Sequence, residues 1–568
     1  MAINAAQTRE ARITEVMDSA RATVIVIGGG INGIGTFREL ALQGTNVLLV
    51  DKGDFASGAS SASSHMIHGG IRYLENGELR LVRESVQERN RLLRLAPHRV
   101  KPLRTTIPIY STFSGILSAP LRMLTHRQHG HPRERGALLI KIGLTIYDLF
   151  SRDGGSVPRH RFLGRRKSLA ELPQLDPRVR YTATYFDAAM EDPERLALDV
   201  LADGLGAGPH AQALNYVEAV GVDARGVLLR DLESNREFRV QADLIVNTTG
   251  PWTDLTNSAL GAPSAFMGGT KGSHIVVDDP ELLAATAGRE IFFENEDGRI
   301  VLIYPLHDRV LVGTTDLEAD PSQPVAITND EIEYFIQLVA RVFPTIPVRR
   351  ERIVFTFSGI RPLPRHEDTS PGLVSRDYRI ESTSVGETDL PMLSLVGGKW
   401  TTFRAVSEHI ADTALAHLAQ TRTRHTTSLT LGAAVGFPTP ENANAWLIEH
   451  LPAVGERRAR VLLQRYGTRC TDVARYLGAQ DSPLVGDELS IGELRYMIDH
   501  EHVVRLADVV LRRTELAFRG LADESVVQAI SDALGQLLGW NALRRLAEVD
   551  ETLALTQAGI ELAPARSH

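Results

Sequence analysis

Three glycines and one acidic residue near the start of the chain have the spacing of a nucleotide-binding loop. Gly28, Gly30 and Gly33 form a G-x-G-x-x-G pattern, and Asp51 follows about twenty residues later. Such glycines allow a tight turn, a close approach of the backbone to a pyrophosphate, and close packing of a helix on a sheet. The carboxylate can accept hydrogen bonds from an unphosphorylated ribose. The pattern therefore predicts a dinucleotide site for FAD or NAD rather than NADP.

The elements expected around this loop form a strand–helix–strand unit. Residues 23–27 and 46–50 are short apolar runs, typical of strands that are buried on both faces of a sheet. Residues 31–42 fit a helix, which Gly44 can end, and the N–H groups at its start would face the phosphates. A further apolar strand at 244–247 runs into Thr-Gly, which fits a return to the same sheet.

Several later loops place glycine beside polar side chains. The small residues of 57–64 would let the backbone lie flat against a cofactor. The turn at 68–73 combines two glycines with histidine, arginine and tyrosine, which indicates a ligand-facing turn. At 397–402 two glycines follow a strand and precede a helix that we expect to start at Thr401, whose N–H groups would attract negative charge. Short loops marked by glycine or charged residues also occur at 358–363 and 375–378.

The rest of the chain indicates an antiparallel layer and a helical end. Residues 290–315 predict three antiparallel strands, with a turn at Asp297-Gly298. After a boundary near 425–435 the pattern is helical only. The helices expected outside the nucleotide-binding unit are 75–96, 494–511 with a capping box at Ser490 and Glu493, and 525–546.

Length and composition limit the class of protein. A chain of 568 residues forms two or three domains, and its net charge of −8 gives no indication of nucleic-acid binding. The single cysteine, Cys470, excludes an internal disulfide or thiolate cluster. It is consistent with a reducing, cytoplasmic setting. We expect no metal site. No apolar run is long enough to span a bilayer. Residues 1–22 lack the apolar core of a secretory signal, so we expect a mobile arm or short helix there.

Residues 99–141 are locally basic in an acidic chain. Eight lysines and arginines, interleaved with apolar residues, accompany a single acid, Glu134. One interpretation is a solvated cap region in which the apolar stems of the basic side chains are buried. The other is a surface that meets anionic lipid headgroups.

Eight motifs occur in order between residues 27 and 404. They are IGGGINGIG (27–35), SSASSHMIHGGIRYL (60–74), NTTGPW (247–252), KGSHIVV (271–277), GTTD (313–316), SGIRPL (358–363), SRDY (375–378) and GGKWTTFR (397–404). On these motifs the chain resembles the FAD-dependent, quinone-linked glycerol-3-phosphate dehydrogenase family. It departs from the family pattern at His65, at Phe403 and in the helix around 37–39.

The resemblance implies an α/β fold with a Rossmann-type, glutathione-reductase-like FAD-binding domain, an interleaved antiparallel-sheet substrate domain and an all-helical C-terminal domain. The implied boundaries are an arm at 1–22, an oxidoreductase domain at 23–425 with its cap at about 99–180 and 265–355, and the helical domain at 430–555. The residues implied to bind FAD are Gly28, Gly30, Ile31, Asn32, Gly33, Asp51, Lys52, Ser60, Ser61, Ser64, His68, Gly69, Gly70, Gly250, Trp252, Gly359, Gly398, Lys399, Trp400, Thr401 and Thr402.

The implied reaction is oxidation of sn-glycerol 3-phosphate to dihydroxyacetone phosphate, with hydride transfer from C2 to flavin N5. The C2 hydroxyl must lose a proton, and His68 is the candidate base, with His274 in reserve. Arginine can bind phosphate oxygens with two hydrogen bonds. The residues implied to bind substrate are Arg72, Tyr73, His274, Arg361, Arg376 and Lys399, and Arg72 and Arg361 join His68 as catalytic residues.

The implied partners are a membrane quinone and an anionic membrane surface, with the protein attached to the inner face of the cell membrane. The sequence does not fix the oligomeric state, and a homodimer is one option. Three alternatives stay open: an oxidase that passes electrons to oxygen, a flavoenzyme acting on another small anionic substrate, and a non-catalytic flavin-binding scaffold. The last would lose the cationic and histidine residues that this chain keeps.

Overall fold

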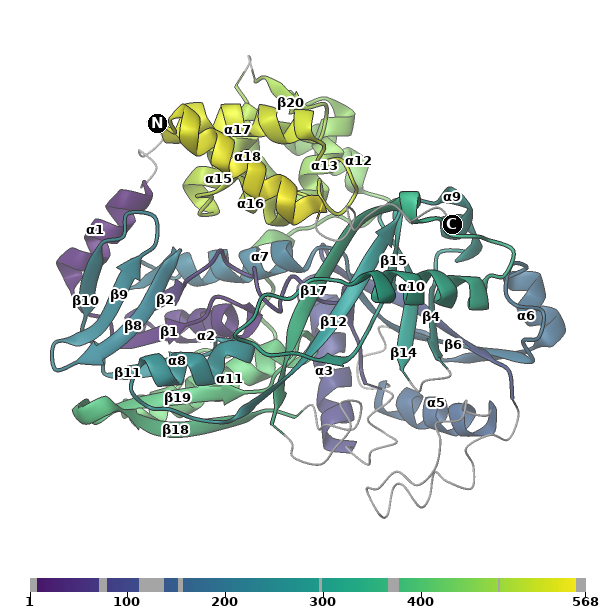
Figure 1. Ribbon diagram of the computed structural model, residues 1–568, viewed down its shortest axis with the longest axis horizontal. Coiled ribbons are helices and arrows are strands. Elements are labelled where there is room, and N and C mark those ends of the chain that lie inside the picture. Colours follow the sequence, from purple (N-terminus) through teal and green to yellow (C-terminus); the bar gives the residue numbers. More distant parts are fainter. Residues whose placement is uncertain are drawn as a thin grey trace.

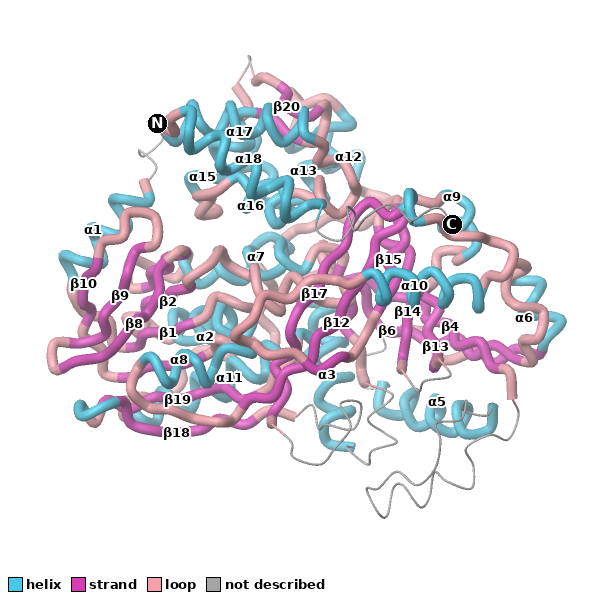
Figure 2. Tube along the Cα trace, viewed as in Figure 1, coloured by secondary structure: helices cyan, strands magenta, loops and turns pink. Residues whose placement is uncertain are grey.

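The computed structural model describes residues 8–70, 79–111, 137–151, 157–295, 299–365, 377–478 and 481–557. Two sheets lie side by side, and the helices of the end of the chain lie above them in the view of Figure 1. Figure 2 shows that strands dominate the second sheet, whereas both helices and further strands lie around the first.

The first sheet has six strands in the order β18-β19-β11-β1-β2-β7. These are β1 (Val24–Ile27), β2 (Val47–Asp51), β7 (Ala211–Asn215), β11 (Leu244–Asn247), β18 (Arg379–Val385) and β19 (Leu390–Val396). All neighbours pair in parallel except β18, which runs antiparallel to β19. The strand–helix–strand unit and the strand at 244–247 confirm the sequence predictions, and this arrangement is typical of dinucleotide-binding sheets.

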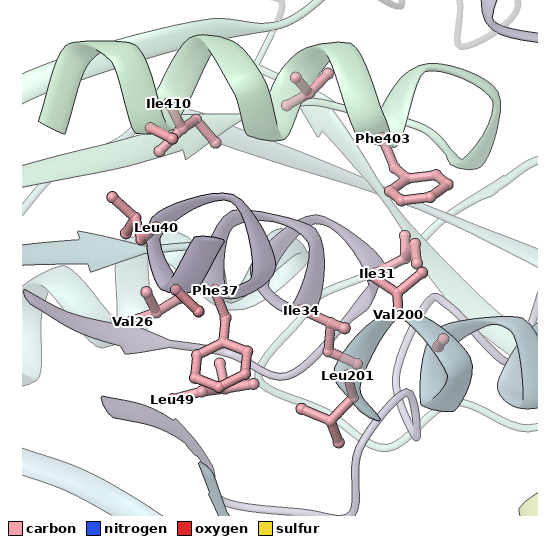
Figure 3. Close-up of a cluster of buried hydrophobic side chains, with 14 of the residues drawn as sticks. Val26, Ile31, Ile34, Phe37, Leu40, Leu49, Val200, Leu201, Phe403 and Ile410 are labelled. Atoms are coloured by element: carbon pink, nitrogen blue, oxygen red, sulfur yellow. The ribbon is translucent and has the colours of Figure 1, made fainter. Parts of the chain in front are cut away.

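Three helices cover one face of this sheet: α2 (Ile31–Leu42), α7 (Pro193–Leu205) and α11 (Phe403–His417). Apolar side chains of α2 fill the space between the strands and the other two helices (Figure 3). Gly204 of α7 makes room for the ring of Phe37, because an added Cβ would lie 2.6 Å from that ring. Phe37 and Phe403, two departures from the family pattern, therefore belong to the hydrophobic core.

The other face is covered by a small antiparallel sheet and two helices. They are α1 (Arg9–Ser19), β8 (Val217–Asp223), β9 (Gly226–Asp231), β10 (Glu237–Val240) and α8 (Thr253–Ala259). Ile13 and Val16 of α1 are buried in the same cluster as Ile25 and Leu48 of the main sheet. The described part of residues 1–22 is thus the short helix, one of the two forms expected there.

The second sheet follows the order β16-β12-β15-β14-β13-β4-β6-β3, with β17 paired to β12 and β5 paired to β6. Its strands are β3 (Met66–Ile67), β4 (Val100–Ile109), β5 (Arg161–Gly164), β6 (Tyr181–Met190), β12 (Met267–Val277), β13 (Glu290–Glu294), β14 (Ile300–Leu306), β15 (Arg309–Gly313), β16 (Leu317–Glu318) and β17 (Ile353–Pro364). The antiparallel meander β13–β14–β15 confirms the prediction for 290–315. Its predicted turn at Asp297-Gly298 lies outside the described residues.

In the described part of the chain, five helices accompany the second sheet. They are α3 (Leu79–Leu95), α5 (Ala137–Ser151), α6 (Arg165–Glu171), α9 (Pro280–Ala285) and α10 (Asn329–Val342). Helix α3 agrees with the helix predicted at 75–96, whose first residues lie outside the described part of the chain. Helices α3 and α5 pack on β4 and β6 through a shared apolar cluster that includes Val86 and Leu144.

The end of the chain is mainly helical and has its own hydrophobic core. Its helices are α12 (Ala443–His450), α13 (Glu456–Tyr466), α14 (Cys470–Ala474), α15 (Ile491–His500), α16 (Leu506–Asp508), α17 (Glu524–Leu538) and α18 (Ala542–Gln557), with a π-helical turn η9 (Val509–Arg513). A two-stranded ribbon, β20 (Pro483–Val485) and β21 (Leu489–Ser490), was not expected there.

Two helix predictions in this region were wrong in extent. The helix expected at 494–511 is α15, which begins at Ile491 and ends at His500, and the chain resumes helical form only at α16. Ser490 caps α15 as predicted, but the Glu493 carboxylate binds Arg465 and Tyr466 rather than closing the capping box. The helix expected at 525–546 is two helices, because Gly539 adopts φ 71 and ends α17.

Asp54 joins the loop after β2 to this helical region. Its carboxylate is fully buried and accepts hydrogen bonds from Arg512 and Arg513 of η9, with Arg513 Nη2 2.9 Å from Oδ1. Asn215 also donates to Oδ1, at 3.0 Å. Although burial alone would raise it, the two guanidiniums hold the pKa of Asp54 well below its usual range. The helical region therefore fixes the loop that begins at Asp51.

Candidate active site

Several segments meet at the carboxyl ends of β1, β11 and β19, where sheets of this kind bind nucleotides. Gly28 has φ 103, and a Cβ on Gly33 would lie 1.8 Å from the Gly28 carbonyl oxygen. Only glycine therefore lets α2 begin so close to β1. We call the segments 28–33, 51–53, 57–64, 248–252 and 397–402 together the cofactor cradle. It contains 17 of the 21 residues implied to bind FAD, namely 28, 30–33, 51, 52, 60, 61, 64, 250, 252 and 398–402. Gly29 also lies in this loop, although it was not among the predicted residues.

The polar groups of Asp51 and Ser60 hold the glycine loop in place. The Asp51 carboxylate accepts hydrogen bonds from the backbone N–H groups of Gly29, at 2.6 Å, and Gly53, at 2.7 Å. Ser60 Oγ accepts one from the Ile31 N–H, at 2.9 Å, in the first turn of α2. Burial raises the pKa of Asp51. The predicted contact of Asp51 with a ribose stays a prediction.

The small-residue segment 57–64 forms a series of turns between the two sheets, and its predicted contact with the cofactor stays a prediction. Trp400 Nε1 donates to the Ser60 carbonyl at 2.9 Å. On the other side, a Cβ on Gly359 of β17 would lie 2.3 Å from Ala62 Cβ, so the backbones are in close contact. A cavity of about 610 Å³ borders this segment, and Lys52, Ser61, Trp252 and Gly359, all implied to contact the cofactor, line it.

Buried polar atoms in the cradle fit a bound flavin nucleotide. Within the described residues, Asn32 Oδ1 and Thr402 Oγ1 of the cradle are buried without a hydrogen-bond partner, as is Nδ1 of His274, which contacts the cradle at Ser64. Such groups are normally paired, so they mark places where the polar atoms of a ligand can bind. Gly398, at φ 106, lies against Asn32, because an added Cβ would be 2.8 Å from its Nδ2. The residues present therefore fit FAD.

Arg361 of β17 is held in one orientation by the loop that precedes β16. Its Nη1 donates to Asp316 Oδ1 at 2.9 Å, and its Nη2 donates to Thr314 Oγ1 and the Thr315 carbonyl, both at 2.9 Å. The Arg361 side chain stays 21% exposed, so an anion can still reach it. Sequence reasoning missed these three partners, although GTTD was among the motifs noted.

The Arg361 guanidinium lies against Gly272 of β12, because an added Cβ there would be 2.1 Å from its Nη2, and His274 is two residues further along the same strand. The Nε2 of His274 is 2.8 Å from Ser64 Oγ, and its ring stacks on Phe357 with 4.7 Å between ring centres. Burial, and then the charge of Arg361, hold the pKa of His274 well below its usual value, so the imidazole is neutral. The structure thus brings together His274, Arg361 and Ser64, which are far apart in the sequence.

The His68–Gly70 turn contacts the 397–402 segment. Thr401 Oγ1 donates to the His68 carbonyl at 3.2 Å. The predicted helix start at Thr401 was wrong, because residues 400–402 form a 3-10 turn and α11 begins at Phe403. Lys399 Nζ donates to Ser85 Oγ of α3 at 3.2 Å, so this segment spans from the cradle to α3.

His65, the remaining single-residue departure from the family pattern, packs against the helical region. Its Nδ1 donates to the Glu191 carbonyl at 2.8 Å, and its ring centre lies 5.3 Å from that of Phe518 in the helical region. Burial lowers the pKa of His65 to about 4, so it is neutral. Arg72, Tyr73 and Arg376 lie outside the described residues, and their roles stay predictions.

The nucleotide cradle lies at the edge of a mainly parallel sheet and faces a mainly antiparallel sheet that carries a cation and a histidine. This arrangement is suited to a flavin-dependent oxidoreductase. Comparison with known families agrees. Residues 23–387 match the family described as FAD dependent oxidoreductase, and residues 392–545 match the C-terminal domain of alpha-glycerophosphate oxidase. FAD is therefore the cofactor, and across the described residues no group of His, Cys, Asp and Glu side chains could hold a metal ion.

Relatives of similar length narrow this class. The chain is 34% identical to a glycerol-3-phosphate dehydrogenase of Synechocystis (90% of this chain, 93% of the relative) and 32% identical to the aerobic glycerol-3-phosphate dehydrogenase of Escherichia coli (87% and 93%). It is also 32% identical to a D-erythritol 1-phosphate dehydrogenase of Brucella abortus (87% and 94%). The fold resembles the glycerol-3-phosphate dehydrogenase of Bacillus halodurans complexed with FAD, with a TM-score of 0.75 and 22% identity over 98% of this chain and all of the other. The chain belongs to the FAD-dependent glycerol-3-phosphate dehydrogenase family.

Proposed function

We propose that this protein oxidises sn-glycerol 3-phosphate to dihydroxyacetone phosphate and that the electrons pass to a membrane quinone. The observation that carries the proposal is the position of Arg361 beside the neutral His274, next to Ser64 of the cofactor cradle. A phosphate needs a cation, and the reacting carbon must lie against the cofactor. The relatives named glycerol-3-phosphate dehydrogenase support the choice of substrate.

The chain's own residues bind the substrate and move the proton. Bound FAD supplies the acceptor for the hydride that leaves C2 of the substrate. His68 takes the proton of the C2 hydroxyl as that hydride leaves. Arg361, with Arg72 and Arg376, holds the phosphate, and Tyr73, His274 and Lys399 complete the binding site. Asp316 keeps the Arg361 guanidinium oriented before the substrate arrives.

Arg361→Ala should weaken the apparent affinity for glycerol 3-phosphate by about tenfold or more. A charge-assisted hydrogen bond contributes about 1.5–3 kcal/mol, and this change removes it. The measurement is KM from steady-state kinetics, with FAD content determined from the visible absorbance. Arg365→Ala is the matched control, because Arg365 follows β17 and is exposed. Equal weakening for glycerol 3-phosphate and for a phosphate-free analogue would show that Arg361 does not bind the phosphate.

A longer phosphorylated polyol is the second candidate substrate. It rests on the Brucella abortus relative, which is as similar to this chain as the Escherichia coli one. Steady-state kinetics with glycerol 3-phosphate and D-erythritol 1-phosphate, each with a soluble quinone and with oxygen as acceptor, separates the alternatives. A higher kcat/KM for glycerol 3-phosphate with quinone supports the proposal, whereas fast turnover with oxygen alone identifies an oxidase.

We propose that the protein attaches to the inner face of the cell membrane from the cytoplasm. Helix α5 supports this proposal, because Leu138, Ile142, Ile146 and Leu149 recur along one side of it and are 36–51% exposed. Lys141 lies on the same helix, and α5 is on the opposite side of the molecule from the C-terminal helices (Figure 1). No helix in the described ranges is long and apolar enough to cross a bilayer. Residues 112–136 of the basic region lie outside the described residues.

The protein should co-sediment with anionic liposomes at low salt, and binding should weaken at high salt. Each basic residue near an anionic surface contributes about 1 kcal/mol, and this attraction is screened by salt. Replacing Leu138, Ile142 and Leu149 by serine should reduce liposome binding at low salt, compared with the wild-type protein. Serine at Leu543 and Leu546, exposed apolar residues of α18, is the matched control. Equal binding to neutral and anionic liposomes would contradict an electrostatic contribution.

A further inference from the structure

A buried carboxylate lies directly behind the turn that carries His68. Strand β3 pairs with β6 at Met66↔Ala189 and Ile67↔Ala188, and the pairing ends there. Asp187 precedes Ala188 in β6, and its side chain, not its backbone, makes the next contact with the segment after β3. Its Oδ1 accepts a hydrogen bond from the Gly69 N–H at 2.9 Å, and both groups are buried. The backbone after His68 is therefore fixed by a side chain rather than by strand pairing.

Two further side chains hold the same carboxylate oxygen. Arg89 Nη1 of α3 donates to Asp187 Oδ1 at 3.0 Å, and the hydroxyl of Tyr147 of α5 donates to it as well. Arg89 also donates to the Tyr147 hydroxyl, at 2.7 Å, and to the Phe186 carbonyl, at 3.0 Å. The side chains of Arg89 and Asp187 are 0% and 1% exposed. A buried ion pair with this many hydrogen bonds resists displacement, because moving one partner leaves a buried charge unpaired.

The His68–Gly70 turn packs closely against this cluster. A Cβ on Gly69 would lie 2.1 Å from the Tyr147 hydroxyl and 2.7 Å from Val86 Cγ2. Burial raises the pKa of Tyr147 well above its usual value, so its hydroxyl stays a neutral donor. On the opposite side of the turn, Thr401 donates to the His68 carbonyl. The peptide between His68 and Gly69 is thus held at its carbonyl by the cofactor cradle and at its N–H by Asp187.

We propose that Asp187, together with Arg89 and Tyr147, is a positioning residue that fixes the backbone of the His68–Gly69 turn. The proposal rests on the proposed function, in which His68 takes the substrate proton. A displacement of about 1 Å in a reacting group can reduce the rate on the order of 10²-fold. Asp187 would therefore influence the reaction without touching substrate or cofactor.

The test compares Asp187→Ala with Asp199→Ala in the FAD-bound protein. Asp199 is a matched control, because it is also buried and paired with an arginine, Arg99, but it does not contact the turn. Hydrogen–deuterium exchange of peptides ending at Gly70 should speed up at least about tenfold in Asp187→Ala and stay unchanged in Asp199→Ala. Anaerobic flavin reduction should slow on the order of 10²-fold in the first variant only.

Two milder variants keep the test decisive if Asp187→Ala does not fold. Asp187→Asn keeps one acceptor oxygen, and Tyr147→Phe removes one donor, so both should give smaller changes in the same direction. Equal exchange in the Asp187 and Asp199 variants would overturn the proposal, as would faster exchange with an unchanged reduction rate and pH profile. If glycerol 3-phosphate does not reduce the wild-type flavin, the proposed function fails, and the exchange result still decides whether Asp187 holds the turn.

Discussion

His68→Asn should slow the reduction of the bound flavin by glycerol 3-phosphate by a factor of about 10²–10⁴, the usual loss on removal of a general base. Asparagine keeps a similar size and some hydrogen bonding but cannot take a proton. The turn that carries His68 is fixed by Thr401 and Asp187, so the substitution should remove the base without moving the backbone. Anaerobic stopped-flow absorbance gives the reduction rate directly.

The pH profile separates His68 from His274. A histidine near its ordinary pKa gives a rate that rises with pH through neutrality. Because burial holds the pKa of His274 well below this range, His274 is neutral throughout and cannot produce such a rise. His210→Asn, a change of the same type at a histidine bonded to the Ala41 carbonyl, is the control. A His68→Asn rate within a few-fold of wild type, with the same profile, would assign His68 a structural role.

Asp54→Asn should destabilise the protein by about 3–5 kcal/mol, the cost of leaving a buried partner charge uncompensated. Arg513 is fully buried, and the substitution would remove the carboxylate that neutralises its charge, whereas Arg512 would keep its ion pair with Asp508. The loss should appear as a lower midpoint of thermal unfolding and as faster proteolysis around η9. FAD should also bind more weakly, because the same loop donates from Ala56 to the Gly29 carbonyl at 2.8 Å.

Asp223→Asn is the matched control for Asp54. Asp223 also pairs with two arginines, Arg225 and Arg239, but its side chain is 38% exposed. Exposed ion pairs contribute little to stability, because water and salt screen them, so this variant should behave almost as wild type. Equal effects of the two substitutions would show that the junction between the loop and the helical region contributes little to stability.

Sequence patterns correctly predicted the helices and strands whose bounds are set by residues close to them in the chain. The bounds of α2 and β11 match the prediction, because glycine spacing and short apolar runs are local signals. The split between α17 and α18 also had a local signal that was overlooked: Gly539 ends one helix, and Asn541 Oδ1 accepts from the Arg544 N–H at the start of the next. The contacts of the π-helical turn η9 with Asp54 join residues far apart in the sequence, and no local pattern contains them.

For the candidate site, the sequence predicted which types of residue take part but not which residues hold them in place. Arginine and histidine in glycine-marked loops indicated an anion site, and His274 and Arg361 do lie together. Their partners depend on folding: Asp316 is 45 residues from Arg361, and Asp187 is 118 residues from Gly69. Asp54 and Arg513 are 459 residues apart. Nothing in the local sequence distinguishes these carboxylates from exposed ones.

Anaerobic titration of the purified protein with glycerol 3-phosphate, followed by the flavin absorbance in the visible range, tests the central claim most directly. The protein should be yellow as purified, and glycerol 3-phosphate should bleach it. Glycerol should not bleach it, because we expect the site to recognise the phosphate through Arg361. A protein that binds FAD but is not reduced by glycerol 3-phosphate, or is reduced equally by glycerol, would contradict the account.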